Sequence, residues 1–512
     1  MSNTIKKIVI VGGGTAGWMV AARLSAKYQA SDKSDVSITL VESADVKPIG
    51  VGEGTWPSMR KTLQDMGISE TEFIRECDVT FKQGSKFNGW LTGEAGDHYY
   101  HPFTPPIDFE TQNPAGYWQD SDIKKSFSLA VSPQESVCEA GLAPKQITTP
   151  EYASVANYGY HLNAAKFSSL LKSHCMKNHA VRHVVDNVIA VNSADNGDIA
   201  SVNTKENGNI EGDLFVDCSG FACLLLGKHY GVPFIDKHDT LFVDTALAVQ
   251  IPYDTDNAPI SSVTNSTATS AGWIWDIGLQ NRKGIGHVYS SRHNSESKAE
   301  QELLTYLGEA QKHVEIRKIP IKAGHRKHPW QNNCVAIGLS AGFLEPLEAS
   351  ALVQVELSAS WLADQLPANR ESMDIVAKRF NTAFKYRWER IIDFLKLHYV
   401  LSQRTENFWV DNRHADSIPD SLAEVLELWK FNYPSVLDFD RIGELFPTES
   451  YQYILSGMGF RTRSPFPMPT QKQQLMVEKM HRVQELTKSY VQNLSNNRDL
   501  IEKIKLQGLQ KI

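Results

Sequence analysis

A glycine-rich turn close to the start of the chain constrains the fold more than any other feature. The apolar stretch Ile5–Val11 leads into the turn Gly12–Gly17, and a helix-compatible run follows from Trp18 to Tyr28. A second apolar stretch, Val36–Glu42, is rich in β-branched residues and ends in an acid. The order strand, tight turn, helix, strand is that of a parallel βαβ unit. Residues 1–42 are therefore predicted to open a Rossmann-type α/β domain.

The residues of this turn suit a dinucleotide. Gly12 allows the tight turn, Gly14 lets backbone N–H groups approach a pyrophosphate at the helix N-terminus, and Gly17 lets the helix pack on the strand. Glu42 is placed to bind the ribose hydroxyls. A glycine turn alone is a weak signal, but the strand, the helix and the acid around it make it strong. The expected cofactor at this point is FAD or NAD.

The dinucleotide-binding domain is predicted to be discontinuous, because a chain of 512 residues exceeds one compact core. Stretches with strand character recur at 185–192, 199–204, 214–218 and 334–338. Two aromatic, proline-containing insertions separate the pieces and suit a substrate cavity, and the pattern turns helical from Ala349. The predicted division is 1–90, 155–225 and 330–365 for the cofactor domain, 90–155 and 225–330 for an inserted substrate region, and 365–512 for a mainly helical C-terminal subdomain.

The amino-acid composition argues against nucleic acids, membranes and metal ions as binding partners. The chain has 52 basic and 59 acidic residues, so it has no basic surplus to neutralise the phosphates of a nucleic acid. No stretch of 18 or more residues is uninterruptedly apolar, and the first residues are polar, which predicts a soluble cytoplasmic protein that does not enter a membrane. The six cysteines lack metal-ligand spacing, so reduced thiols and no metal site are expected.

Later segments favour FAD over NAD. Ile49–Pro57 packs glycines and a proline into a segment suited to fold over a flavin. Phe215–Phe221 and Ile337–Glu348 follow, and the second has the strand, glycine, helix form that cradles a flavin. This order is typical of flavin monooxygenases. The further residues expected to contact FAD are Thr15, Ala16, Val51, Gly52, Val188, Gly338, Leu339 and Leu352.

Several motifs follow one another along nearly the whole chain. The main ones are GGGTAGW at Gly12–Trp18, IGVGE at Ile49–Glu53, the segment Phe81–Phe87, WIWDI at Trp273–Ile277 and the run Asn332–Glu348. Shorter ones occur at His161–Asn163, Leu397–Tyr399, Phe408–Trp409 and Asn412–His414. Together these motifs resemble those of the flavin-dependent tryptophan halogenases.

The resemblance implies a specific chemistry. Reduced FAD and oxygen supply an oxidant for chloride or bromide, and the resulting hypohalous acid travels through the protein to an aromatic substrate. Lys82 matches the lysine that holds the halogen, and Glu348 matches the catalytic acid. A halide is expected at the backbone N–H groups of Ser350 and Ala351. Without the resemblance, Lys82 reads as a solvated surface lysine and Glu348 as a first-turn helix charge.

Four aromatic positions complete the resemblance. Trp273 and Trp275 match a pair that shields the flavin and keeps substrate from direct contact with it, although paired tryptophans are more often core residues. His101 and Phe103 match residues that line an indole pocket. The alternative interpretation is that they are simply a partly buried histidine and a partly buried aromatic residue in a loop.

Three departures from the family concern activity and substrate. Gly278 stands where the family has proline, which is expected to loosen a turn. Ala349 replaces a serine that links lysine, acid and substrate in the family, which puts halide selectivity and efficiency in question. The stretch Phe446–Tyr453 is shorter than the family's aromatic lid and has no tryptophan. An indole without the amino-acid zwitterion, or a larger indole or phenol, is therefore favoured over free tryptophan.

The leading hypothesis is an FADH2- and O2-dependent halogenase. It implies a separate flavin reductase, because the chain has no second glycine motif for a nicotinamide nucleotide, and it is compatible with a homodimer. The alternatives are a flavin-dependent aromatic hydroxylase or epoxidase, and an FAD-binding protein that has lost halogenase activity. Trp273, Trp275 and Lys82 argue against the hydroxylase, whereas the changes at Ala349 and Gly278 leave the inactive protein open.

Overall fold

The computed structural model of the chain describes residues 4–28, 35–46, 52–109, 113–178, 181–439, 444–466 and 468–511. Two compact units are present, each built from three separate stretches of chain. Unit 1 comprises residues 1–78, 162–237 and 322–388, and unit 2 comprises residues 79–161, 238–321 and 389–512. These units are compact bodies rather than functional domains, so the domain limits given above stay predictions. Each unit is described by itself.

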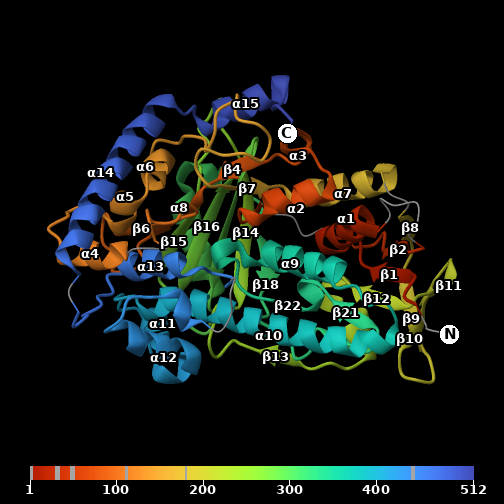
Figure 1. Cartoon of the computed structure of the whole chain (residues 1–512). Coiled ribbons are helices and arrows are strands. Elements are labelled where there is room, and N and C mark those ends of the chain that lie inside the picture. The colour runs from red at the N-terminus through yellow and green to blue at the C-terminus, as the bar shows by residue number, and fades with distance from the viewer. Residues whose placement is uncertain are drawn as a thin grey trace. The chain divides into compact units, whose positions relative to one another are not determined.

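The centre of unit 1 is a six-stranded sheet (Figure 1) with the order β20-β21-β12-β1-β2-β8. Its strands are β1 (Lys7–Val11), β2 (Ser37–Glu42), β8 (Arg182–Val185), β12 (Leu214–Asp217), β20 (Trp330–Gln331) and β21 (Cys334–Ala336). All neighbours pair in parallel except β20 with β21. Parallel strands buried on both faces read as continuous apolar runs, which is why sequence predicted β1, β2, β12 and β21.

Helices cover this sheet and small antiparallel sheets flank it. The helices are α1 (Thr15–Tyr28), α2 (Ser58–Met66), α3 (Glu70–Glu76), α7 (Ala164–Asn178) and α9 (Ser350–Asp364). The three-stranded sheet of β9 (Val188–Ser193), β10 (Ile199–Thr204) and β11 (Gly208–Glu211) contains the predicted hairpin. One boundary was wrong: Val185 ends β8 of the main sheet, because it pairs with Glu42 rather than with the hairpin.

Unit 2 is built on a seven-stranded sheet with the order β18-β14-β17-β16-β15-β5-β6. Its strands are β5 (Gly84–Asn88), β6 (His98–Pro102), β14 (Thr245–Pro252), β15 (Thr264–Thr269), β16 (Gly272–Gly278), β17 (Arg282–Tyr289) and β18 (Arg317–Pro320). All neighbours are antiparallel except β15 with β5. The separate strand β4 (Thr80–Lys82) pairs antiparallel with β7 (Gly159–Leu162).

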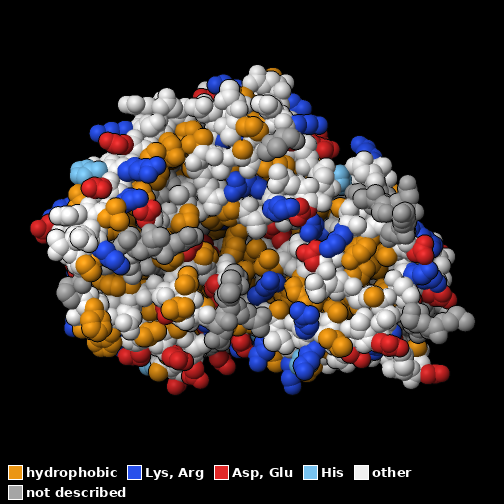
Figure 2. Space-filling view, in the orientation of Figure 1, with side chains coloured by type: hydrophobic (Ala, Val, Ile, Leu, Met, Phe, Trp, Pro, Cys, Tyr) orange, Lys and Arg blue, Asp and Glu red, His pale blue; other side chains and the backbone are white. Residues whose placement is uncertain are grey.

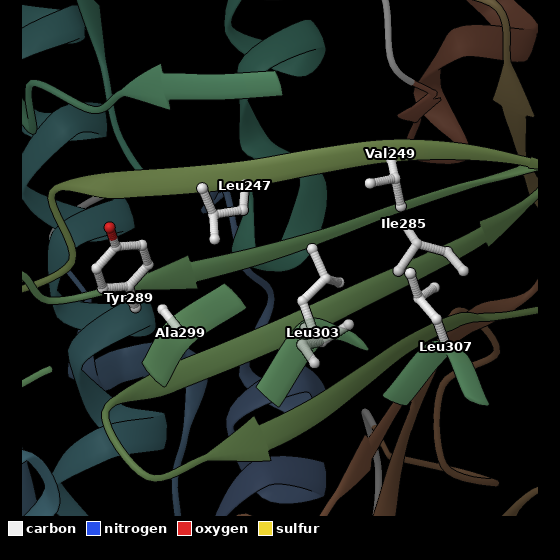
Figure 3. Packing of buried hydrophobic residues seen from close by; sticks show 8 residues of the cluster. Leu247, Val249, Ile285, Tyr289, Ala299, Leu303 and Leu307 are labelled. Carbon is white, nitrogen blue, oxygen red and sulfur yellow. The ribbon is translucent and has the colours of Figure 1, made fainter. Parts of the chain in front are cut away.

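Helix α8 (Glu296–Leu307) closes one face of the unit 2 sheet (Figure 3). Its N-cap Ser295 accepts a hydrogen bond from the backbone of Lys298, and Gly308 in a positive-φ conformation follows its last residue. Ala299, Leu303 and Leu307 recur every fourth position, so they share one stripe of the helix. This stripe packs on apolar side chains of β14, β16 and β17, namely Leu247, Val249, Ile274, Ile285 and Tyr289.

The remainder of unit 2 is helical, as predicted for the C-terminal part. Its helices beyond Glu389 include the end of α10 (Arg370–Val400), α11 (Asn407–Asp411), α12 (Asp420–Trp429), α13 (Thr448–Gly457), α14 (Thr470–Asn493) and α15 (Asn497–Gln507). The predicted amphipathic run 471–510 is two helices, because the chain leaves the helical conformation at Leu494.

Charged side chains of both signs and free cysteines, noted in the sequence, can be located in the structure. Acidic and basic side chains are interspersed over the face shown in Figure 2. The six cysteines are buried free thiols. In the described ranges, no helix is long and apolar enough to cross a membrane. The same ranges contain no group of three or more His, Cys, Asp or Glu side chains that could hold a metal ion.

Candidate functional site

The glycine turn of unit 1 leaves room for a phosphate at the start of α1. A Cβ on Gly12, which has φ of 120°, would lie 2.1 Å from the carbonyl oxygen of Cys218, and a Cβ on Gly17 would lie 1.9 Å from the carbonyl oxygen of Gly12. Both glycines are therefore required for packing. A Cβ on the exposed Gly14 would meet no atom within 4 Å. The first N–H groups of a helix lack intrahelical acceptors, so this opening fits the pyrophosphate of a dinucleotide.

Glu42 lies beside this turn, as the ribose-binding role requires. A Cβ on Gly13 would come within 2.3 Å of the Glu42 side chain. The carboxylate accepts a hydrogen bond from Nε2 of His183 at 2.8 Å and forms an ion pair with Nζ of Lys172 at 3.3 Å. These two contacts hold Glu42 at the carboxyl end of β2. The predicted contact Val188 begins β9 shortly after β8, the strand that pairs with β2.

Gly338 packs against the start of the same helix, and Leu339 follows it in the chain. They lie in the short helix η4 (Gly338–Ser340), and a Cβ on Gly338, which has φ of 75°, would lie 2.8 Å from Cβ of Ala16. The buried carboxylate of Asp217 accepts a hydrogen bond from the Ser340 hydroxyl at 3.1 Å and ties η4 to the end of β12. No role was predicted for Asp217 from the sequence, although an acid at the end of a buried strand indicates a structural or binding role.

Asp217 holds further backbone in place. Its carboxylate also accepts hydrogen bonds from the backbone N–H groups of Ser219, Leu225 and Leu226 at 2.8–3.1 Å. One buried acid thus orders the turn after β12 and the segment carrying Gly338. Of the predicted loop residues, Val51 lies outside the described residues, and Gly52 is buried.

Glu348 and Ala349 have an unusual backbone at the start of α9. Glu348 has φ of 61° and Ala349 has φ of 54°, so two successive residues with a Cβ occupy the left-handed region. The Glu348 carbonyl accepts a hydrogen bond from the indole Nε1 of Trp56 at 2.7 Å. Ser350 and Ala351 follow as the first residues of α9, and Leu352 is buried one residue later. Strain of this kind clusters at functional sites, which suits the predicted roles of these residues.

Glu356 on α9 is another buried acid, and no cationic side chain of the described residues forms an ion pair with it. The hydroxyl of Thr62 on α2 donates a hydrogen bond to Oε2 of Glu356 at 2.9 Å. Burial raises the pKa of Glu356 from 4.5 to about 8, with the hydrogen bonds of Thr62 and Ser58 opposing the shift. The carboxyl is therefore largely protonated near neutral pH.

The protonation of Glu356 predicts a pH-dependent stability. Because the pKa of Glu356 is higher in the folded chain, the folded chain binds more protons than the unfolded chain between pH 4.5 and about 8. The contribution of Glu356 to the free energy of unfolding is therefore complete below about pH 4.5 and is lost as the pH rises through about 8. We expect Glu356→Gln to raise the free energy of unfolding at about pH 9 by about 2–4 kcal/mol, with little effect at low pH. Urea unfolding across pH measures this. The exposed Glu300→Gln is the control, and equal pH profiles for Glu356→Gln and wild type would contradict the assignment.

In unit 2, Lys82 is buried rather than solvated. Its side chain is 1% exposed, and its ammonium lies 5.3 Å from the centre of the Phe103 ring. Lys82 pairs with Gly159 across β4 and β7, and Thr80 pairs with His161, so Lys82 and His161 share one face of the ribbon. Burial and the Lys82 charge lower the pKa of His161 well below its usual value, so this imidazole is neutral. The alternative of a surface lysine is wrong.

Of the predicted substrate residues, Phe103 lies next to Lys82, and His101 precedes Phe103 by two positions, on β6. The backbone N–H of Phe103 donates to the carbonyl of Gln83 at 3.0 Å, and Asn157 donates to the carbonyl of Phe103 at 2.8 Å. His101 is buried, and its Nε2 lies 2.9 Å from the hydroxyl of Ser450 on α13. Unit 2 thus brings Lys82 and Phe103 together, and it holds the His101 ring against α13. Glu348 belongs to unit 1 and is described there alone.

The segment that replaces the family's lid is a buried helix. Most of α13 (Thr448–Gly457) is buried, including Tyr451 and Tyr453, and the Tyr453 hydroxyl donates to the carbonyl of Thr104 at 2.9 Å. The segment Phe446–Tyr453 thus leads into a packed helix that supports the strand carrying His101.

Trp273 and Trp275 project from the same face of β16, with ring centres 6.4 Å apart. A Cβ on Gly286 of β17 would lie 2.1 Å from the Trp275 ring, so this glycine makes room for the indole. Trp273 packs near Trp90 in the core of the unit.

The expectation that Gly278 lies in a turn is wrong. This glycine ends β16 paired with Lys283, and its carbonyl accepts a hydrogen bond from Thr80 at 2.6 Å.

The comparison with known sequences decides the family. The family model described as tryptophan halogenase matches residues 7–474. The chain belongs to the tryptophan halogenase family. Tryptophan 6-halogenase SttH of Streptomyces toxytricini is 35% identical over 483 residues, which cover 90% of this chain and 91% of that protein.

Solved structures agree with this membership. A tryptophan halogenase from Shewanella frigidimarina NCIMB 400 superposes with a TM-score of 0.97 at 47% identity, covering 99% of both chains. BrvH, a flavin-dependent halogenase from Brevundimonas sp. BAL3, superposes with a TM-score of 0.86 at 30% identity, covering 98% of this chain and 99% of that one. The predicted α/β fold with a Rossmann-type FAD-binding domain is confirmed, and the chain is an enzyme of the flavin-dependent halogenase type.

Proposed function

We propose that this enzyme uses FADH2 and O2 to place bromine or chlorine on an electron-rich aromatic ring, with hypohalous acid held at Lys82. The observation that carries the proposal is the burial of the Lys82 ammonium beside Phe103 and the neutral His161. Burying an ammonium group costs free energy of desolvation, so lysine is rarely buried to this degree. Here it supplies a hydrogen-bond donor, or an amine, beside a candidate ring-binding residue.

The residues of unit 1 are assigned to the cofactor and the halide. The start of α1, with Gly14 at its opening, takes the pyrophosphate, Glu42 takes the ribose, and Gly338 with Leu339 lines the flavin. The backbone N–H groups of Ser350 and Ala351 bind the halide. Bound FAD, once reduced, supplies with oxygen the oxidising equivalent that turns halide into hypohalous acid.

The chemical step then belongs to two side chains. Lys82 donates a hydrogen bond to the oxygen of hypohalous acid, or holds the halogen as a haloamine, and so fixes which ring carbon it meets. Glu348 polarises the halogenating species or accepts the proton that leaves the ring. The balance is one aromatic C–H and one HOX giving one C–X bond and water.

The substrate class follows from unit 2. His101 lies on β6, which pairs with β5, and Phe103 bonds to Gln83 next to Lys82. Both residues are assigned to stack on the substrate ring. Trp273 and Trp275 are assigned to keep the substrate away from the flavin. The replacement segment in α13 has no tryptophan, so we favour an indole without the zwitterion, or a larger indole or phenol, over free tryptophan. A separate flavin reductase supplies FADH2. A homodimer and a cytoplasmic location stay predictions.

The test uses purified enzyme with FAD, a flavin reductase, NADH, and bromide or chloride. Incubation with indole, and separately with free tryptophan, is followed by mass spectrometry. We expect a monohalogenated indole that disappears when reductase or halide is omitted. Hydroxylated indole would instead support an aromatic hydroxylase, and FAD binding without any product from indoles or phenols would support a protein that has lost the activity.

A further inference from the structure

The strained backbone at Glu348 and Ala349 needs an external restraint. An L-residue in the left-handed region is disfavoured against ordinary helical or extended conformations, and here two such residues follow one another with φ of 61° and 54°. Neither is glycine or asparagine, the residues that adopt this region readily. Conformations of this kind persist where surrounding contacts hold them.

One long-range contact at this point comes from Trp56. Its indole N–H donates to the main-chain carbonyl of Glu348 at 2.7 Å, across 292 positions of sequence. An indole N–H is a donor only, on a rigid ring, so it suits a fixed carbonyl. Trp56 lies two residues before α2 begins at Ser58. Thr62 of that helix donates a hydrogen bond to Glu356 on α9. The segment 56–62 therefore contacts both α9 and the residues just before it.

We propose that Trp56 is a positioning residue that holds the backbone of Glu348 and thereby aims its carboxylate. The idea rests on the proposed function only in taking Glu348 as the catalytic acid. The side chain of Glu348 is 5% exposed, so its direction is set by its backbone and its packing rather than by solvent. The segment containing Trp56, expected from sequence to fold over the flavin, then has a second task at the catalytic acid.

The test compares Trp56→Phe with wild type in two independent measurements. Phenylalanine keeps an aromatic ring but lacks the N–H donor. In the chain without cofactor, we expect the amides of 349–352 to exchange hydrogen about five- to tenfold faster, as for the loss of one hydrogen bond. In the loaded enzyme, we expect kcat to fall about five- to tenfold while KM for the aromatic substrate and the affinity for FAD stay unchanged.

Two further variants separate positioning from general stability. Trp330→Phe, whose indole donates to the carbonyl of Asn332 at 3.0 Å elsewhere in unit 1, is expected to leave exchange at 349–352 and kcat unchanged. Ala349→Gly makes the left-handed conformation cheaper, so it is expected to restore both exchange and kcat at least in part when added to Trp56→Phe.

The outcomes distinguish this inference from the proposed function. Unchanged exchange at 349–352 in Trp56→Phe would overturn the positioning role, as would an equal change throughout unit 1 or no restoration by Ala349→Gly. If the wild-type enzyme halogenates nothing, the proposed function fails, while the exchange measurements still decide whether Trp56 holds the backbone at Glu348.

Discussion

Lys82→Met is expected to lower the rate of halogenation about 10²–10⁴-fold, the range for removing a group that acts on the reacting atoms. Methionine has a similar length and is readily buried, so it suits a position that is 1% exposed. The variant should therefore still unfold cooperatively in urea, and the loss of rate then reports on the chemistry. Product formation by mass spectrometry gives the rate, and urea unfolding gives the stability.

The control for this change is Lys86→Met on the next strand. Lys86 carries the same charge in the same aromatic segment, but it is partly exposed and forms an ion pair with Glu139 at 2.6 Å. We expect its activity to stay within about twofold of wild type, since partly exposed pairs contribute little. Full activity and unchanged regioselectivity in Lys82→Met would show that free hypohalous acid reaches the ring and that Lys82 does not hold it.

Gly17→Ala is expected to abolish FAD binding and to lower the free energy of unfolding by about 3 kcal/mol. The added Cβ would lie 1.9 Å from the carbonyl oxygen of Gly12, which is backbone and cannot move without opening the turn. Helix α1 must then shift away from β1, and the N–H groups that face the pyrophosphate shift with it. Thermal or urea unfolding and titration with FAD measure the two effects.

Gly14→Ala is the matched variant in the same turn. Its Cβ would meet no protein atom within 4 Å, so the free energy of unfolding of the apo chain should change by less than about 0.5 kcal/mol. The methyl group would instead occupy the space assigned to the pyrophosphate, so FAD affinity should fall about tenfold or more. Equal stability losses in both variants, or unchanged FAD affinity in Gly14→Ala, would mean that the turn serves packing alone.

The burial of Lys82 could not be predicted from its local sequence. Lys82 follows Phe81 in a short strand, and no local pattern distinguishes a buried lysine there from an exposed one. The resemblance to halogenases assigned its role, and burial in unit 2 then excluded the surface alternative. The sequence did not show that His161 lies on the same face as Lys82, because this depends on the register of β4 and β7.

Sequence by itself determined the βαβ unit from β1 to β2, the hairpin of β9 and β10, the discontinuous parallel sheet, and the family. Each of these strands and motifs is encoded in residues that are near one another along the chain, where apolar periodicity and glycine spacing act directly on backbone conformation. Only the tertiary structure decided that α13 is buried, that Gly278 ends a paired strand, that Asp217 orders the segment of Gly338, and that Trp56 reaches Glu348 across 292 positions. Such contacts join distant residues through packing and register, and the chain between them carries no local signal of the partner.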